Sequence, residues 1–460
     1  MRSSIILSLT VLLFFAPFGR AREGAVVATS RALTLSDCIA LALNESPLLE
    51  ASRLDVTSAT EAARSARAQT LPELTATGSA LVFSGSPTSK FSIVNADSTV
   101  LIPRNPARGN SGKSVSGAGV EVYSAHLAYP LFRDGSILGL NTAPAEASQL
   151  AKRRNLAWTA RLRREDVIAR ITDAYITTVS AENRAGYAER RVKLLRQQVN
   201  ITDEQQKQGL TLPIDLKLAK SQLNGSETLA KILRQQAVAG KIELSRALGF
   251  ETPDELHLSN ELPEPPEPPS AELLLGSNLS QHPSLEVQKA VIEQSRQEYR
   301  LERFRLYPTV SLQGSAVHID DFGSSGAEIY TGAVSVNVPI FDFGAQQATT
   351  RSRLAKYQAE RARLGAVTDD VTFEIVTIYQ SIYVLSQNIL SLQQEVAKAD
   401  RDFQVTGSQQ QEGIATPLTA VEKELHLIAK RDDLDGLQVR RLMLYAALQK
   451  ASGGSWKWFQ

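Results

Sequence analysis

Alternation of apolar and small polar residues marks four segments of this chain. The clearest alternation runs through 308–317 and 330–341, and weaker versions occupy about 73–83 and 119–131. A period of two residues predicts strands with one apolar and one polar face. A half-buried sheet of a soluble protein would show the same alternation, so the pattern alone leaves the surroundings of the sheet open.

A second pattern, with apolar residues every three or four positions, fills most of the remaining chain. Residues 145–207 and 345–411 contain no proline. They predict helices of roughly 95–100 Å at ~1.5 Å per residue. A Gly-x-x-x-Pro turn follows each, and a returning helix is expected at 214–249 and 418–450. Helices this long with a narrow apolar face need neighbours along their length, as in a coiled coil or a helical array.

Each pair of strands is preceded by a shorter helix. The first is expected from a cap at Thr34 to about Gln69, where Pro72 stops it. The second is expected at 271–307, with a break near Pro283. The order helix, two strands, two long helices therefore occurs twice.

The two halves also share short sequences in the same order. Residues 46–80 align without a gap to 282–316. Further on, "YPLFRDG" at 129–135 corresponds to "VPIFDFG" at 338–344, and "QGLTLPID" to "EGIATPLT". Ordered matches of this kind indicate an internal repeat.

These landmarks divide the chain into five parts. Residues 1–21 have an apolar core and small residues at the expected cleavage site, which is typical of a secretory signal peptide. A first repeat is expected at 22–260, a proline-rich linker at 261–274, and a second repeat at 275–450. The tail 451–460 carries two tryptophans that either pack on the helices or extend freely.

Composition excludes several classes of function. The net charge of +1 gives no global signal for nucleic-acid binding. Cys38 is the one cysteine, so no disulfide forms within the chain, and it is expected to be a small buried residue. The five histidines lack metal-ligand spacing, and no nucleophile or phosphate-loop motif occurs, so we expect no enzyme, cofactor or metal. After the signal core, no segment is expected to form a membrane helix.

The ordered set of signal peptide, duplicated unit, strand pairs, long helices and the "PLF-x-x-G" and "PIFDFG" segments resembles the outer membrane efflux proteins, the TolC family. The resemblance covers essentially the whole mature chain. It implies a mainly α fold in which three copies each give four strands to one outer membrane β-barrel and extend a long α-helical tunnel into the periplasm. It also implies an exit duct of a tripartite efflux pump or type I secretion system, in contact with outer membrane lipid.

The repeated "PLF" and "PIF" segments are expected at the junction of barrel and helices. Proline cannot donate to a strand ladder and would end each strand, and glycine would let the chain turn into the helix. The aromatic side chains would lie at the membrane interface or pack in the junction. The junction residues are Pro130, Phe132, Gly135, Pro339, Phe341 and Gly344.

The turns between the long helices are expected at the periplasmic tip of the tunnel. In the family this end meets a periplasmic adaptor protein and, through it, an inner membrane transporter. Gly209 and Leu210 fit that contact, and Gly413 and Ile414 fit it less well. These residues also suit an ordinary helix-hairpin turn, which needs glycine for positive φ.

Asp215 and Glu422 lie just after the two turns, where family members often carry acids. In a trimer each would form a ring that favours cations at the tunnel mouth. A solvated helix face is the alternative for both. For the whole protein the alternative is a periplasmic coiled-coil scaffold or adhesin without a channel, and the cargo and the pump class stay open.

Overall fold

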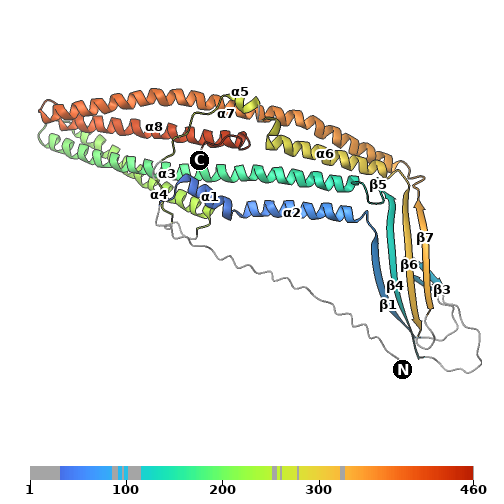
Figure 1. Ribbon diagram of the computed structural model, residues 1–460. Coiled ribbons are helices and arrows are strands. Elements are labelled where there is room, and N and C mark those ends of the chain that lie inside the picture. Colours follow the sequence, from blue (N-terminus) through green and yellow to red (C-terminus); the bar gives the residue numbers. More distant parts are fainter. Residues whose placement is uncertain are drawn as a thin grey trace, which may run out of the picture.

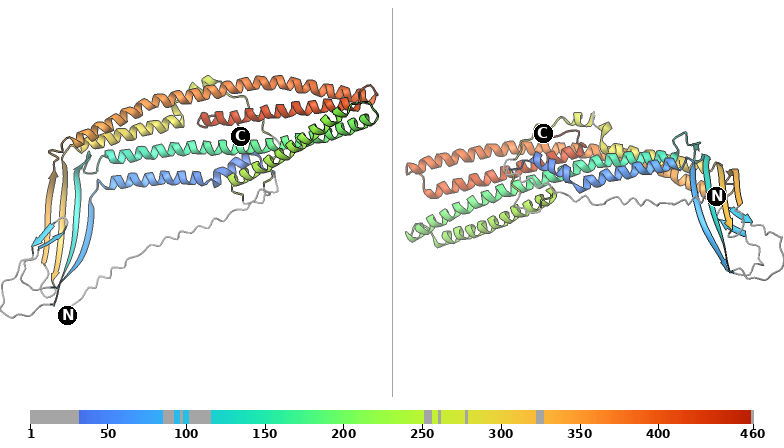
Figure 2. Two further views of the ribbon diagram at one scale, coloured as in Figure 1. Left: turned by 180° about the vertical axis from the view of Figure 1, so that it is seen from behind. Right: turned by 60° about the horizontal axis from the view of Figure 1, so that its bottom comes forward.

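A computed structural model of the chain describes residues 32–84, 92–95, 98–101, 116–250, 256–259, 262–276, 279–321 and 327–458. The expected signal peptide lies outside the described residues. The molecule is a long helical body with a sheet at one end, and the sheet is turned away from the helix axes (Figure 1). The turns between the long helices both lie at the opposite end of the body in every view (Figure 2).

Six helices build the body. They are α2 (Pro47–Ala68), α3 (Pro144–Lys207), α4 (Pro213–Leu248), α6 (Pro283–Phe304), α7 (Ala345–Gln411) and α8 (Pro417–Ala451). Next to the sheet they pack in the order α2, α3, α6, α7. Farther from the sheet, α3 packs on α4 and on α8, and α8 packs on α7, so the order there is α4, α3, α8, α7. The body is therefore a layer whose edge helices are α2 and α7 near the sheet, and α4 and α7 near the tip.

Proline and glycine set the ends of the long helices, as predicted. A proline is at the first position of α3, α4 and α8, where a missing N–H costs nothing. Gly344 precedes α7 in the left-handed region. The observed bounds of α3 and α7 agree with the predicted ones within one residue.

The predicted single helix at 34–69 is wrong. The chain forms α1 (Leu35–Glu45) and α2, separated by Ser46 in an extended conformation. The residue before a proline avoids the α region, so Pro47 starts a new helix. Thr34 caps α1 together with Asp37 as predicted, because each accepts a backbone N–H of the other.

The second short helical region is divided as well. It consists of α5 (Ala271–Gly276), a 3₁₀ turn at Leu279–Gln281, and α6, which starts at the predicted break at Pro283. The helix ends at Phe304, three residues before the predicted end. Between α4 and α5, the proline-rich residues 262–270 form no regular element.

The sheet is antiparallel, with the order β1, β4, β6, β7. Its strands are β1 (Glu73–Ser84), β4 (Ser116–Arg133), β6 (Thr309–Asp321) and β7 (Ala327–Asn337), and the two-residue β5 (Ser136–Ile137) adds to β4. A separate hairpin joins β2 (Ser92–Asn95) and β3 (Ser98–Leu101). The strands of the two sequence halves meet where β4 pairs with β6.

In the half of the sheet next to the helices, the register gives one apolar and one polar face. Toward the far end the pattern reverses, with Glu121, His318 and Glu328 on the first side and Val122, Val317 and Ile319 on the second. Residues paired directly across strands point to the same side. On the apolar face are Leu74, Ala76, Ala125, Leu127, Val310, Leu312, Ala316, Val334 and Val336. On the polar face are Thr75, Thr77, Ser124, His126, Ser311, Gln313, Ser315, Thr331 and Ser335, and hydroxyl pairs such as Thr77 with Ser124 at 2.6 Å join neighbouring strands. The predicted alternation is therefore present in three dimensions.

Two predicted strand ends are wrong. β4 continues past Pro130 to Arg133, with a shift of register between Pro130 and Phe132. An irregularity of this kind accommodates a residue that has no N–H to donate. β7 ends at Asn337, so Val338 and Ile340 do not belong to the strand. In that copy the proline follows the end of the strand.

The main apolar core lies in the middle of the body, where α1, α3, α4, α7 and α8 meet. Tyr175, Ile176 and Leu244 are fully buried in it, and the Tyr175 hydroxyl donates to the Ser259 carbonyl at 3.0 Å. Cys38 is also fully buried, and burial raises the pKa of its thiol to about 12. Cys38 is therefore a small buried side chain, as predicted, and the raised pKa keeps its thiol protonated.

The C-terminal tail belongs to this core. The ring centroids of Trp456 and Trp458 lie 5.6 and 6.3 Å from that of Tyr445 on α8, and Trp458 is buried. The sequence left open whether this tail packs or extends, because two tryptophans after a helix have no periodic pattern.

The expectation of no apolar stretch long enough for a membrane helix needs correction. Within α7, no charged residue lies between Glu374 and Glu395. By length and composition alone, an 18-residue stretch of this helix is long and apolar enough to cross a membrane. A single helix of this kind is weak evidence for a span. Ile375, Ile382 and Ile389 are buried at intervals of seven, which is the spacing of a coiled-coil seam.

Candidate functional site

The first junction between sheet and helix is a tightly bonded turn that follows β4. Gly135 has φ +83°, and a Cβ at this position would lie 2.5 Å from the Phe304 ring. The Asn141 side chain accepts from the Ile137 N–H at 2.7 Å and donates to the Gly135 carbonyl at 2.8 Å. Phe132 is half-buried and pairs with Val310 of β6. This turn fixes the direction in which the chain enters α3.

The second junction is built differently, although its sequence is similar. The Asp342 carboxylate accepts from the backbone N–H of Gly344 at 2.9 Å and of Gln346 at 2.8 Å, and so caps α7. Gly344 has φ +85°, but a Cβ there would meet nothing within 4 Å. Phe341 and Phe343 are 76% and 92% exposed, with their ring centroids 4.6 Å apart. The cap by Asp342 and the exposure of Phe343 were not predicted.

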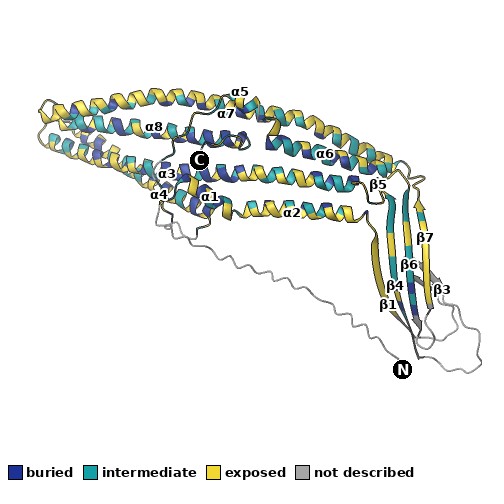
Figure 3. Ribbon diagram, viewed as in Figure 1, coloured by how far each residue is buried: buried dark blue, intermediate teal, exposed yellow. Residues whose placement is uncertain are grey.

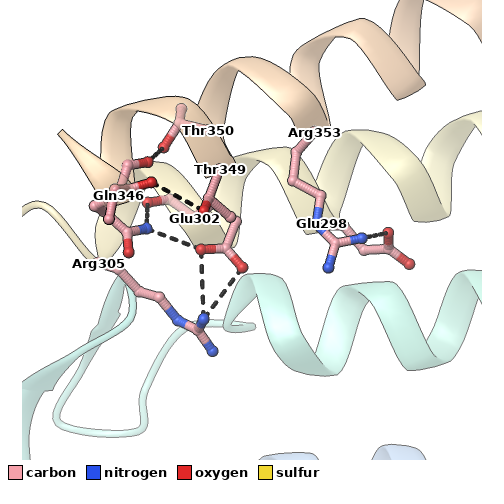
Figure 4. A network of polar contacts seen from close by, with 8 residues as sticks. Glu298, Glu302, Arg305, Gln346, Thr349, Thr350 and Arg353 are labelled. Carbon is pink, nitrogen blue, oxygen red and sulfur yellow. Dashed lines mark hydrogen bonds and ion pairs between the residues drawn. The ribbon is translucent and has the colours of Figure 1, made fainter.

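Ion pairs and hydrogen bonds tie α6 to α7 beside this junction (Figure 4). Glu302 is buried and accepts from Gln346 Nε2 at 2.8 Å and from Arg305 at 3.1 Å. One turn earlier on α6, Glu298 accepts from Arg353 and Lys356 of α7, both at 3.1 Å. Burial alone would raise the pKa of Glu298, but hydrogen bonds from Lys356 and Gln294 and the nearby positive charges lower it. Glu298 is therefore a carboxylate that holds two cations in place.

A hollow of about 500 Å³ lies over these helices, close to the sheet. Its lining comes from α2, α3, α6 and α7, and its charged residues are Lys152, Glu298, Arg353 and Lys356. Helices α2 and α7 are not neighbours in the layer, so a hollow that both of them line lies on the concave side of the layer. The other lining residues are mostly alanine, serine and glutamine.

The tip opposite the sheet carries exposed apolar side chains. Gly209 and Gly413 have positive φ with open space around them, and Leu210 and Ile414 are 70% and 71% exposed. In the first turn Leu212 and Ile214 are also exposed, which the sequence analysis did not single out. The signal for a binding surface was available in the sequence, because both residues are large and apolar and lie where the returning helix begins. They would be buried only if another element packed on this end. Figure 3 shows the largely exposed tip and the buried stretches in the middle of α3 and in the C-terminal half of α8.

The two acids predicted at the tunnel mouth are both exposed and near the tip. The Asp215 carboxylate accepts from the Leu212 N–H at 3.1 Å, so it also caps the start of α4. Glu422 lies on α8 in a second hollow, of about 520 Å³, that Arg191 and His426 also line. The structure gives no direct contact between Asp215 and Glu422.

Ion pairs between α3 and α8 join the two helical hairpins between the core and the tip. The Arg190 guanidinium donates twice to Glu424, at 2.7 and 3.2 Å, and Arg184 lies 3.4 Å from Asp432. Beside Asp432, the buried Asp435 has a raised pKa because of desolvation and the charge of Asp432. Sequence reasoning missed these pairs because their partners are more than two hundred residues apart.

The part of the chain that the structure describes contains no group of three or more His, Cys, Asp or Glu side chains arranged for a metal ion.

Comparisons with known proteins agree with this geometry. Residues 274–454 match the family model described as outer membrane efflux protein. The pyoverdine export outer membrane protein OpmQ of Pseudomonas aeruginosa is 28% identical over 190 residues, which are 39% of this chain and 38% of OpmQ. The matched region thus spans little more than a third of that relative.

Solved structures extend the likeness to nearly the whole fold. The outer membrane protein VceC of Vibrio cholerae aligns with a TM-score of 0.71 at 19% identity, covering 92% of this chain and 97% of VceC. The outer membrane channel CmeC of Campylobacter jejuni gives 0.73 at 13% identity, covering 93% and 87%. The fold that the sequence suggested by resemblance is therefore confirmed as mainly helical and of the outer membrane channel type. Residues 274–454 match the outer membrane efflux protein family, and over most of its length the chain has the fold of the solved outer membrane channels.

Proposed function

We propose that three copies of the chain close into one channel across the outer membrane. The observation that carries this proposal is the sheet, which has two free edges and, in its half next to the helices, one apolar and one polar face. Among the described strands, β1 pairs only with β4 and β7 pairs only with β6. Four long strands cannot close a barrel, and long exposed edges are sites of further pairing. Pairing of β7 with β1 of the next copy would bring the apolar face to lipid and the polar face to the lumen.

The helices support the same head-to-tail arrangement. Large apolar side chains are exposed on both edge helices near the tip and the core. On α4 these are Leu229, Ile232 and Ile242, and on α7 they are Phe373, Tyr383 and Leu390. Two different surfaces that pair between copies generate a ring when the rotation closes. Contact of α4 with α7 of the next copy would cover both surfaces and continue the barrel as a tunnel.

This channel would be the passive exit duct of a tripartite efflux pump or a type I secretion system. Its relative OpmQ is named as an export protein. The apolar tip would contact a periplasmic adaptor protein, and the adaptor would link it to an inner membrane transporter that supplies the energy. For the tip to open, the two hairpins must move apart, which requires the pairs Arg190–Glu424 and Arg184–Asp432 to separate. Asp215 and Glu422 would then lie at the mouth.

The first test is a measurement of oligomeric state and conductance. Protein extracted from outer membranes is expected to have the mass of three copies in native mass spectrometry and to give discrete conductance steps in a planar bilayer. A protein that is released from cells without detergent, and that stays monomeric and non-conducting, would contradict the channel and favour the periplasmic scaffold.

A second test concerns the tip. Replacing Leu210 with Asp puts a charge into the proposed adaptor contact, and loss of such an anchor typically costs about 2–4 kcal/mol of binding. Export measured in cells should then fall at least tenfold, while bilayer conductance stays at the wild-type level. Leu218→Asp is the control, because Leu218 is also exposed (59% against 70% for Leu210) but lies on α4, beyond its first turn. Equal export by wild type and Leu210→Asp would remove Leu210 from the contact.

A further inference from the structure

Basic residues are concentrated in the helices next to the sheet. Residues 144–164 and 345–365, which begin α3 and α7, contain eleven basic and two acidic side chains. These segments thus have a net charge of +9, whereas the whole chain has +1. Both segments start at the junction with the sheet, so they form one basic belt at that end of the body (Figure 1). The remaining chain is correspondingly acidic.

Part of this belt lines the concave hollow described above. Lys152 comes from α3, and Arg353 and Lys356 come from α7. The one acid of the lining, Glu298, is already bonded to Arg353 and Lys356. Three cations and one carboxylate leave the hollow with a net charge of +2. Because Glu298 holds two of the cations in fixed positions, their charges point at the hollow without a large cost in side-chain entropy.

Other residues of the belt point away from the hollow, so the basic residues are divided between the two sides of the layer. Arg161 follows Lys152 by nine residues, and at ~100° per residue it lies on the opposite side of α3. Its guanidinium stacks on the Trp158 ring, 4.3 Å from the ring centroid. Arg161 therefore has the same charge and the same helix as Lys152 but does not line the hollow.

We propose that the hollow is one third of an anion-selective collar in the tunnel, directly below the barrel, and that the cargo is an organic anion carrying carboxylate, sulfate or phosphate groups. This inference rests on the proposed closure of three copies. The closed ring would place nine cations and three carboxylates around the tunnel wall. A ring of fixed charge of one sign in a narrow passage raises the local concentration of the opposite ion and repels its own kind.

The experiment is the reversal potential of single channels in a KCl gradient. The wild type is expected to pass chloride in preference to potassium. The triple variant Lys152→Gln, Arg353→Gln, Lys356→Gln should lose this preference or reverse it. Glu298→Gln should change selectivity in the opposite direction, because the net charge of each hollow rises from +2 to +3. Arg161→Gln is the matched control and should leave the reversal potential unchanged.

The results separate this inference from the proposed function. A conducting trimer that prefers potassium, or a triple variant that behaves like the wild type, overturns the collar and leaves the channel intact. If no variant conducts but native mass spectrometry still gives three copies, the collar is decided by thermal unfolding in detergent with inositol hexakisphosphate as a polyanion probe; a non-conducting monomer overturns the channel and the collar together. The probe should raise the melting temperature of the wild type and of Arg161→Gln but not of the triple variant, and equal shifts in all three would overturn the collar.

Discussion

Replacing Leu312 with Lys is expected to prevent stable insertion of the sheet into the outer membrane. Leu312 is the fourth of the 13 residues of β6, is exposed on the apolar face, and is paired with Tyr129 on one side and Val334 on the other. A lysine on the lipid face of a barrel costs about 2–4 kcal/mol near the midplane of the bilayer. A barrel of three copies would contain three such lysines and would incur this cost three times. The measurement is the fraction of protein in washed outer membranes, together with the fraction of trimer.

Gln313 provides the control for this experiment. It is the next residue of the same strand, is also exposed, and points to the polar face between Ala128 and Ala333. Gln313→Lys introduces the same charge on the side proposed to line the lumen, where water can solvate it. It should insert and assemble like the wild type. Normal insertion of both variants would contradict the assignment of the apolar face to lipid, and failure of both would show that β6 tolerates no lysine on either side.

Replacing Gly135 with Ala should strongly destabilise the first junction. The backbone at Gly135 is in the left-handed region, which costs an alanine about 1–2 kcal/mol. The new methyl group would also lie 2.5 Å from the Phe304 ring. Overpacking of this kind typically costs about 1–3 kcal/mol more. We therefore expect the free energy of unfolding to fall by about 2–5 kcal/mol, as measured by thermal or denaturant unfolding in detergent.

The equivalent glycine of the second junction separates the two causes. Gly344 has nearly the same φ but open space around it, so Gly344→Ala should cost only the backbone part, about 1–2 kcal/mol. The double variant Gly135→Ala with Phe304→Leu should recover part of the loss, because a leucine can move away from the new methyl group. Equal destabilisation at Gly135 and Gly344 would mean that the contact with Phe304 adds no strain.

These two glycines show how far the sequence could predict the junction. The repeated segments located both turns and made a positive φ at each glycine reasonable, because glycine is the residue that adopts it freely. The sequence could not predict that Phe304 packs on Gly135, since Phe304 belongs to the other half of the chain. Nor could it predict that β4 carries Pro130 through an irregular register while β7 stops before Pro339. Local chemistry is similar in the two copies, but their neighbours differ.

The tip and the hollow show the same division. A Gly-x-x-x-Pro turn identifies a helix hairpin from local residues, so Gly209, Leu210, Gly413 and Ile414 could be selected in advance. Lys152 and Arg353 are two hundred residues apart, and their place on one concave surface depends on the order in which α2, α3, α6 and α7 pack. The sequence analysis accordingly expected selectivity from acids at the mouth and did not single out the basic residues beside the sheet.

The sequence by itself determined the four long helices, the four long strands, their order, and the alternation that gives these strands two different sides. Periodicity, proline and glycine act within a few residues, and the apolar and polar sides of a strand follow from the alternation alone. Only the tertiary structure decided that Trp458 packs into the core, that Glu298 holds Arg353 and Lys356, and that Arg190 bonds to Glu424. Each of these contacts joins residues far apart in the chain, and packing geometry, which no local pattern encodes, brings them together.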